Sequence, residues 1–271
     1  MITNIVHKIK KIFFYKKYNF LRYLRLILNK DQKIIIKHKS LILPPGHLLS
    51  LYNELYPDYD KFIFSVVTKL NENDSIIDIG ANIGDTLYRI FHHDKNYKYY
   101  LIEADHYFFQ YLKKNVSILT KSFEAKITLI NELVGSELIG NLSKDTTGTK
   151  TLIQSDKGIK SKSLDRIISE YNIDNIALIK IDVDGYDFNV LFSGIKNITK
   201  FKPKLFFEYM GLNQRSYLEI IEKLHTIGYK NWFVISNYGD KIVKNLNYND
   251  INNLIKSNKT NKMTFDIYCY C

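Results

Sequence analysis

Short apolar runs alternate along this chain with longer stretches in which apolar residues recur every three or four positions. The runs predict strands at 76–79, 99–102, 127–130, 176–181, 205–207, 232–235 and 265–270. The helical spacing predicts helices near 58–70, from 86 onward, and near 107–116, 163–171, 186–198 and 216–227. Strand–helix alternation is typical of an α/β fold with a mostly parallel, twisted sheet and helices on both faces.

The end of the chain departs from this alternation. No helix of strand-spanning length is obvious between the last two predicted strands, although 249–256 has helical character. We therefore expect the final strand to be antiparallel. Between these regular elements, 136–162 is irregular and rich in Gly, Ser, Thr and Lys, which predicts a functional lid or hairpin that selects the substrate.

The stretch 75–86 organises the remaining elements. Two apolar residues, Ile76 and Ile77, lead into Asp78, a turn with Gly80 and Gly84 follows, and a helical pattern begins at Thr86. Glycine permits positive φ and close approach of a ligand, and a helix start favours an anionic group. Because Asp78 suits a cationic group or a hydroxyl, the stretch predicts a small ligand that carries both charges.

Acidic residues follow the first five predicted strands. They are Asp78, Glu103, Glu132, Asp182 and Glu208. Because the carboxyl ends of parallel strands meet at one edge, these side chains predict a ligand cleft at the switch point beside the first strand.

The residues of the glycine turn favour one ligand over others. The turn lacks the G-x-G-x-x-G of dinucleotide sites and the lysine of a P-loop. S-adenosylmethionine (SAM) has an ammonium, a carboxylate, a ribose and an adenine, and it fits this edge. Glu103 is placed to accept from both ribose hydroxyls.

Charge divides the 271 residues unevenly. The formal net charge is +11, and residues 1–40 hold eleven Lys or Arg and only one acid, Asp31. The remaining 28 basic and 27 acidic residues nearly cancel. With the helix-breaking segment 41–47 as a boundary, we expect a basic amphipathic arm over 1–40 and one domain over 41–271.

The arm has three interpretations: a helix docked on its own domain, a contact with an anionic membrane surface, or a clamp on nucleic acid. No apolar run is long enough to span a bilayer, and no signal peptide is recognisable. Cys269 and Cys271 are expected to be reduced thiols and not a metal site. These features predict a cytoplasmic protein. If the arm contacts a membrane, we expect peripheral binding at the inner membrane face.

The chain resembles the FkbM family of Rossmann-like SAM-dependent methyltransferases. The resemblance covers about 75–210 and rests on Ile77–Thr86, Ile102–Asp105, Asn131–Gly135, Ser163–Asp165, Lys180–Asp187, Gly194 and Pro203–Glu208. The family usually has Glu where this chain has Asp184 and Asp187, and Pro where it has Ala104.

The resemblance implies roles for individual residues. The turn from Gly80 through Asn82 to Gly84, beside Asp78, would hold the methionine part of SAM, and Glu103 its ribose. The adenine would be bordered by Glu132 and Leu133. The methyl group and the acceptor would be faced by Lys180, Asp182 and Asp184. Family members often methylate hydroxyls of sugars or secondary metabolites, so we expect O-methylation of a sugar in a surface glycan or glycolipid.

Asp182 is our candidate general base, or it holds the acceptor hydroxyl, and Lys180 would tune it electrostatically. A divalent cation on Asp182, Asp184 and Glu208 is the less favoured alternative, and we expect no metal. Two rival functions are a nucleic-acid methyltransferase and a non-catalytic, membrane-tethered module. The near-neutral body and the lack of an Asp/Asn-Pro-Pro-aromatic motif argue against nucleic acid.

Overall fold

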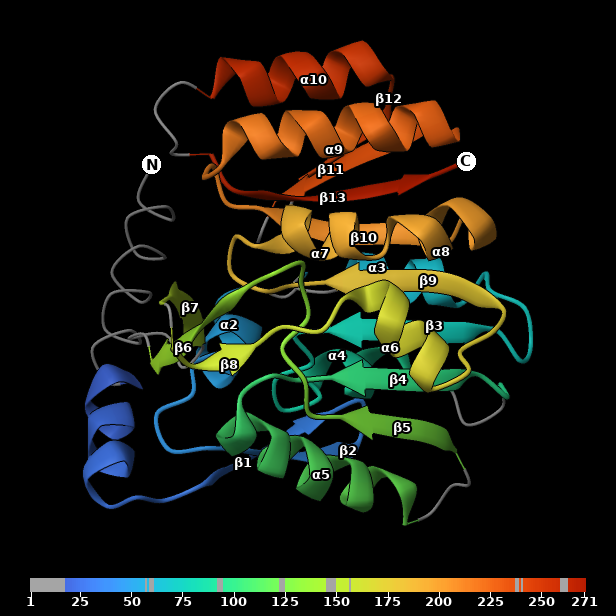
Figure 1. Ribbon diagram of the computed structural model, residues 1–271. Helices are drawn as coiled ribbons and strands as arrows, with labels where there is room; N and C mark the ends of the chain where they lie inside the picture. The colour runs from blue at the N-terminus through green and yellow to red at the C-terminus, as the bar shows by residue number, and fades with distance from the viewer. Residues whose placement is uncertain are drawn as a thin grey trace, which may run out of the picture.

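The computed structural model describes residues 18–271, except 57, 59–60, 92–94, 122–124, 145–149, 156, 237–238, 240 and 259–262. The first part of the predicted basic arm, residues 1–17, lies outside the described residues. In the described part of the chain, an eight-stranded sheet has the order β12-β11-β13-β10-β9-β3-β4-β5 (Figure 1). The strands are β3 (Ser75–Ile79), β4 (Lys98–Ile102), β5 (Lys126–Ile130), β9 (Ile176–Ile181), β10 (Lys204–Tyr209), β11 (Asn231–Ser236), β12 (Ile242–Leu246) and β13 (Phe265–Tyr270).

Strand directions confirm the predicted fold class. The pairs β3–β4, β4–β5, β3–β9 and β9–β10 are parallel. The final strand β13 is antiparallel to both neighbours, β10 and β11, as expected. β12 was not predicted, because it is a short edge strand whose side chains are mostly exposed and lack a buried apolar face.

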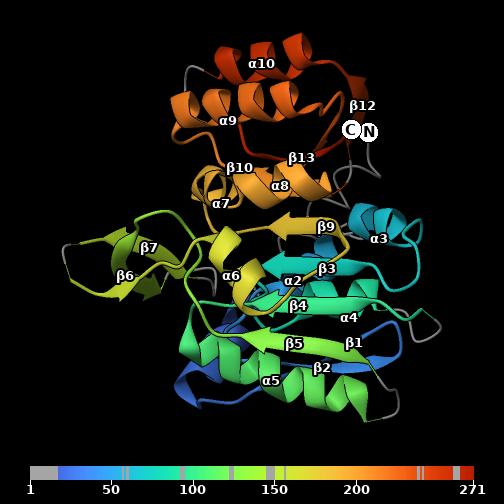
Figure 2. The same ribbon diagram turned by 45° about the vertical axis from the view of Figure 1, so that its right-hand side comes forward.

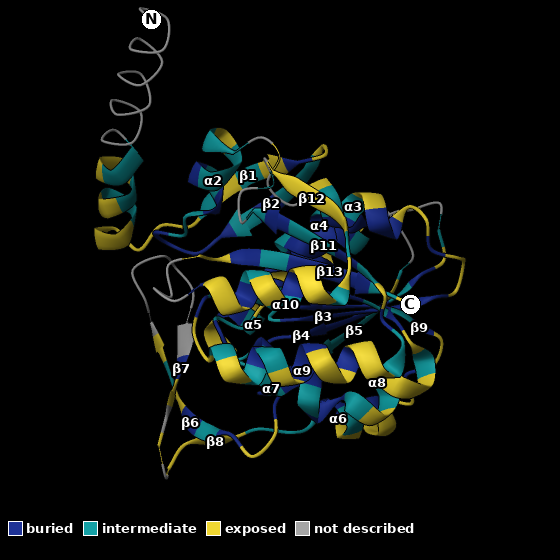
Figure 3. Ribbon diagram, turned by 90° about the horizontal axis from the view of Figure 1, so that it is seen from above, coloured by how far each residue is buried: buried dark blue, intermediate teal, exposed yellow. Residues whose placement is uncertain are grey.

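Helices cover both faces of the sheet. They are α2 (Leu49–Leu55), α3 (Lys61–Val67), α4 (Asp85–Ile90), α5 (His106–Thr120), α6 (Leu164–Glu170), α7 (Asp187–Ser193), α8 (Ile195–Phe201), α9 (Gln214–Ile227) and α10 (Tyr248–Ser257). Ile77 packs in a core with α6, α7, α9 and α10, whereas Ile76 packs on the opposite face with α2 to α5. Figure 3 shows buried strands between helices with exposed outer faces.

The helix predicted over 186–198 is two helices, α7 and α8, divided at Gly194. A Cβ at Gly194 would lie 2.6 Å from the Leu164 side chain, so α6 can approach the chain closely here. The division is therefore a packing feature that periodicity alone does not reveal.

A hairpin of β1 (Gln32–Ile36) and β2 (Lys39–Leu43) precedes the parallel sheet, and it was not predicted. It is fixed to α5 because Ile42 N–H donates to Asn115 Oδ1 at 2.8 Å, and Asn115 Nδ2 donates back to Ile42 O at 2.9 Å. The expected division between residues 40 and 41 lies within β2.

The irregular segment 136–162 contains a hairpin, as one of its two interpretations predicted. It forms a three-stranded sheet, β7-β6-β8, from β6 (Ile139–Lys144), β7 (Lys150–Gln154) and β8 (Ile159–Lys160). Figures 1 and 2 show β6 and β7 at the side toward which the arrowheads of β3, β4, β5 and β9 point. The small sheet therefore stands beside the edge where parallel strands place a ligand.

None of the helices in the described residues combines the length and apolar character that crossing a membrane requires.

Candidate functional site

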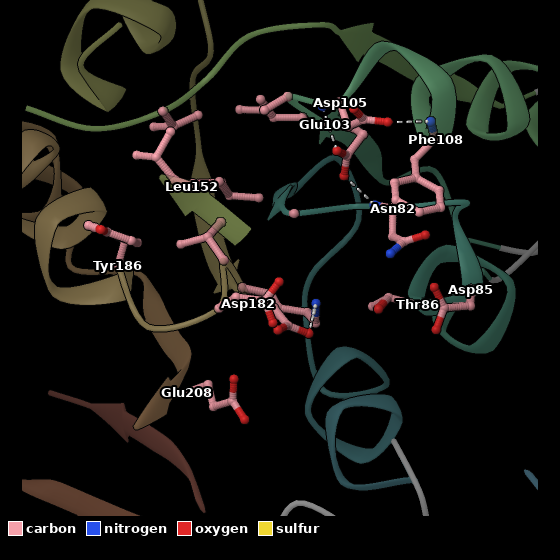
Figure 4. A pocket seen from close by; sticks show the side chains of 18 of the residues that line it. Asn82, Asp85, Thr86, Glu103, Asp105, Phe108, Leu152, Asp182, Tyr186 and Glu208 are labelled. Carbon is pink, nitrogen blue, oxygen red and sulfur yellow. Dashed lines mark hydrogen bonds and ion pairs between the residues drawn. The ribbon is translucent and has the colours of Figure 1, made fainter. Parts of the chain in front are cut away.

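A cavity of about 510 Å³ opens at the carboxyl ends of β3, β4, β9 and β10. Eight of the predicted site residues line it: Gly80, Asn82, Glu103, Glu132, Leu133, Lys180, Asp182 and Asp184. Figure 4 shows Asn82 and Glu103 toward one side of this cavity and Glu208 toward the other, with Asp182 between them. The predicted cleft beside the first parallel strand is thus present.

Asp78 and Gly84 do not line the cavity, in contrast to the direct contact that we expected. Asp78 is only 1% exposed and lies opposite Lys180 in the register of β3 and β9. Lys180 Nζ lies 3.2 Å from Asp78 Oδ1 and 3.3 Å from Asp182 Oδ2. The cationic group that Asp78 binds is therefore the protein's own ammonium.

Burial raises the pKa of Asp78, and the Lys180 charge opposes this rise. Lys180 is itself 4% exposed, so its tip does not lie in solvent. The pair places a positive charge under the floor of the cavity and directs it toward Asp182.

The glycine turn is shaped by its neighbours in the fold. Gly80 has φ +81°, and a Cβ there would lie 1.9 Å from the carbonyl oxygen of Asp182. Gly84 has φ +91°, and a Cβ would lie 2.9 Å from Leu112. The close approach that Gly80 permits is therefore made by the end of β9 and not by a ligand.

Backbone N–H groups of the turn are largely used within the protein. Those of Gly80 and Ala81 donate to Ile102 O, and that of Gly84 donates to Ala81 O. The Asn82 N–H donates to Glu103 Oε2 at 2.8 Å. The first two and the last of these bonds hold the turn against the end of β4, and the Gly84 bond closes the turn itself. A ligand bound beside the turn therefore needs donors other than these four groups.

Glu103 is held in place through both of its carboxylate oxygens. Oε1 accepts from Asp105 N–H at 2.8 Å, and Oε2 accepts from Asn82 N–H. Burial raises the pKa of Glu103 to about 7, although the two N–H donors oppose the rise. Each oxygen retains a lone pair for a ligand hydroxyl, so Glu103 can bind a vicinal diol.

Next to Glu103 the cavity wall becomes apolar. Leu133 packs with Leu138 and Leu152 in a cluster that the small β-sheet completes. Glu132 lies at the border, where its carboxylate accepts from Lys162 Nζ at 2.7 Å. This wall suits a flat, weakly polar ring beside Glu103.

The opposite part of the cavity, which we call the acidic lobe, is lined by Asp182, Asp184, Glu208 and Asp266. Burial raises the pKa of Glu208 to about 9, and the surrounding carboxylates, Asp182 first, add to the rise. Glu208 is therefore protonated at neutral pH. The Asp182 side chain is 51% exposed and accessible from the cavity.

Behind the lobe, Asp187 is fully buried and accepts from the Glu208 N–H at 3.0 Å. Within the described part of the chain, no group of three or more His, Cys, Asp or Glu side chains is arranged to hold a metal ion.

Several lining residues were missed from the sequence. Thr264 and Asp266 reach the acidic lobe because β13 runs antiparallel and brings its first residues to this edge. Ser236 is the last residue of β11 and lies opposite Phe265 of β13. His47 and Tyr52 come from the segment before the parallel sheet. Asp266 lies in a strand that was predicted, but its position at the site depends on the pairing of β13 with β10, which was not predicted.

Comparison with known proteins decides the family. The model of the methyltransferase FkbM domain matches residues 78–231. This chain belongs to the FkbM methyltransferase family. The family resemblance expected from the sequence is thereby confirmed, and SAM as the expected cofactor agrees with it. A comparison with curated proteins found no match.

Solved structures with a similar fold include the FkbM methyltransferase from Methylobacillus flagellatus KT, at 18% identity and a TM-score of 0.42. The match covers 74% of this chain and 44% of that one, so this chain spans less than half of that protein. Fibrillarin from Aeropyrum pernix, solved with bound S-adenosyl-L-methionine, is 11% identical over 88% of this chain and 82% of that chain, at a TM-score of 0.45.

Proposed function

We propose that this FkbM domain transfers a methyl group from SAM to a hydroxyl of a sugar in a glycan or glycolipid. One observation carries the proposal: a single cavity joins the diol-binding carboxylate Glu103 to the exposed carboxylate Asp182. The family match supports methyl transfer, and the acidic lobe supports the kind of acceptor.

The residues present fit the cofactor. Glu103 would accept from the ribose hydroxyls, and Leu133 and Leu138 would cover the adenine. Asn82 and Asp85 also line the cavity and offer oxygen acceptors for the methionine ammonium. When bound, SAM supplies an electrophilic methyl group on a sulfonium.

Asp182 would act on the acceptor. Its Oδ2 faces Lys180, so Oδ1 is the atom placed to take the proton of the acceptor hydroxyl. Lys180 donates to Oδ2 and thereby orients the carboxylate. Glu208 is protonated at neutral pH and donates a hydrogen bond instead of accepting a proton. The remaining rate acceleration would come from alignment of the acceptor oxygen with the methyl group.

The chemistry of the lobe favours a polyhydroxylated acceptor over a phosphate-rich one. Carboxylates such as Asp184 accept hydrogen bonds from hydroxyls and repel phosphates. Ser236 and Thr264 add two hydroxyls to the same wall. A nucleic-acid acceptor would bring phosphates close to these acids, which argues against that alternative.

Thermal unfolding with S-adenosylhomocysteine (SAH) or NAD tests the cofactor. We expect SAH to raise the melting temperature and NAD to leave it unchanged. Mass spectrometry of glycans from cells with and without the gene then tests the acceptor. A mass difference of one methylene unit on one sugar supports the proposal; methylation confined to nucleic acid would refute it.

We also propose that the basic arm contacts an anionic membrane surface. In its described part, the helix over 18–27 exposes Phe20, Tyr23 and Ile27 by 63%, 63% and 61%. These apolar side chains recur on one helical face, as interfacial helices require. Sedimentation with phosphatidylserine vesicles should pull down the wild type and lose the Phe20→Ser/Ile27→Ser variant; equal sedimentation of both would contradict this role.

A further inference from the structure

His47 enters the cavity from a loop that precedes the residues of the family match. Its Nδ1 accepts a hydrogen bond from the Leu49 N–H at 3.2 Å. Burial lowers the pKa of the imidazole, although Asp85 opposes this change, so the ring is neutral at pH 7. With Nδ1 as acceptor, the proton of the neutral ring is on Nε2.

Nε2 of His47 is buried and has no hydrogen-bond partner, and the same holds for Oδ1 of Asn82. The Asn82 side chain lies next to this imidazole and, together with the Asp85 carboxylate, favours its charged form, whereas the Arg22 charge opposes it. The edge of the ring packs against Phe108, with centroids 6.3 Å apart and an interplanar angle of 86°. A buried donor and a buried acceptor therefore lie close together in one wall of the cavity without forming a hydrogen bond of good geometry.

Buried polar groups without partners are uncommon in folded proteins, and a ligand is one way to satisfy them. One donor and one acceptor, beside the Asp85 carboxylate, match the carboxylate and the ammonium of an amino acid. Four N–H groups of the turn next to them, at 80, 81, 82 and 84, donate within the protein and are not available to that carboxylate.

We propose that His47 donates its Nε2–H to the carboxylate of the methionine part of the methyl donor, while Asn82 Oδ1 accepts from its ammonium. This assignment rests on the proposed function, since it presupposes that SAM occupies the cavity. It makes a residue outside the matched domain part of the cofactor site.

The N-terminal helix braces this loop. Tyr18 OH donates to His47 O at 3.0 Å and lies 2.7 Å from Ser50 Oγ. Arg22 Nε donates to Gly46 O at 2.8 Å. Helix and loop are in close contact, because a Cβ at Gly46 would lie 2.6 Å from the Leu26 side chain. Residues 18–26 therefore position His47, and this role is independent of the proposed membrane contact of the arm.

Calorimetric titration of the full chain with SAH, and with its decarboxylated analogue, tests the assignment. His47→Phe keeps the ring volume and removes the donor. We expect SAH affinity to fall about 10- to 100-fold, the range for a hydrogen bond to a charged group. Affinity for the analogue, which keeps the ammonium but has no carboxylate, should not change.

Two further variants complete the test. His47→Gln restores an N–H donor and should recover most of the SAH affinity. His225→Ala changes an exposed histidine on α9 and serves as the matched control. Tyr18→Phe loosens the loop without touching the ligand, and it should weaken SAH binding only slightly.

Equal losses for SAH and the analogue in His47→Phe would assign His47 a purely structural role and overturn the proposal. Unchanged SAH affinity in that variant would also overturn it. If wild type binds neither ligand, the proposed function itself fails; if wild type binds SAH and only the variants disagree, the failure is confined to His47.

Discussion

Asp78 and Lys180 occupy facing positions on the parallel strands β3 and β9, and the Lys180 ammonium lies 3.2 Å from Asp78 Oδ1. Both side chains are buried, at 1% and 4% exposure. The same ammonium reaches Asp182 at the cavity surface. The charge that we expect to stabilise the catalytic base therefore depends on an ion pair inside the sheet.

Replacing Lys180 with Met should destabilise the fold in a pH-dependent way. Removing one partner of a buried pair leaves an uncompensated charge, which costs about 3–5 kcal/mol. Asp78 can avoid this by taking up a proton, since burial already raises its pKa. We therefore expect urea denaturation to show a larger loss at pH 8 than at pH 5.5.

The double variant Asp78→Asn/Lys180→Met is the control. It removes both charges, so its free energy of unfolding should exceed that of Lys180→Met at pH 8. A Lys180→Met loss that is the same at both pH values would show that Asp78 does not carry the penalty.

Asp182→Asn should reduce methyl transfer without weakening SAH binding. The loss of a general base typically lowers turnover by about 10²- to 10⁴-fold. Glu208→Gln is the matched comparison, because Glu208 is already protonated at neutral pH and its amide keeps a donor. The effect on turnover is measured by transfer of a labelled methyl group to the acceptor, and the effect on binding by calorimetry with SAH. Equal losses in both variants would refute Asp182 as the base.

The raised pKa of Glu208 makes stability depend on pH. Between the ordinary value of 4.5 and about 9, the folded chain keeps a proton that the unfolded chain releases. The unfolded state then binds fewer protons, so the free energy of unfolding falls as pH rises, by up to about 1.4 kcal/mol per pH unit.

Urea denaturation of wild type and Glu208→Gln between pH 5 and 8.5 checks this. The variant should have the flatter profile and the greater stability at the alkaline end. Glu222→Gln, at an exposed position on α9, is the control and should keep the wild-type slope. Parallel profiles for wild type and Glu208→Gln would contradict the assignment.

Much of the site could be predicted because parallel strands bring their carboxyl ends to one edge. Glu103, Glu132, Asp182 and Glu208 each follow a short apolar run, and all four line the cavity. Their convergence needs only the strand order and not the packing of side chains. The antiparallel direction of the final strand was predicted correctly but for a different reason. A helix, α10, does precede β13, and the chain is reversed by the unpredicted strand β12, which is antiparallel to β11.

Other features depend on tertiary contacts that no local pattern encodes. Asp266 reaches the acidic lobe because β13 pairs with β10 in the register that places it opposite Glu208. Asp78 was predicted to bind the ligand. The sequence pattern does not reveal that it instead pairs with Lys180, because Lys180 lies about a hundred residues later in the sequence. His47 follows a Pro-Pro-Gly segment that reads as a boundary, and only the docking of the N-terminal helix brings it to the cavity.

The last prediction concerns Gly80. We expected this glycine to give a ligand room, but it is needed because the backbone of Asp182 passes close to it. A Cβ at Gly80 would lie 1.9 Å from Asp182 O, whereas one at Gly228 would lie 3.6 Å from the flexible end of Lys202. Both glycines have positive φ, at +81° and +118°, so alanine adds backbone strain at each site. Only Gly80→Ala must also displace the end of β9.

We therefore expect Gly228→Ala to lose about 1 kcal/mol of stability through strain alone. Gly80→Ala should lose clearly more, and methyl transfer should fall with it, because the displaced carbonyl belongs to the residue that we assign as base. Urea denaturation and the transfer assay measure both effects. Equal destabilisation of the two variants, with methyl transfer intact, would contradict this prediction. It would show that the Asp182 backbone can move without loss of stability or activity, and that the glycine turn does not position the Asp182 carboxylate.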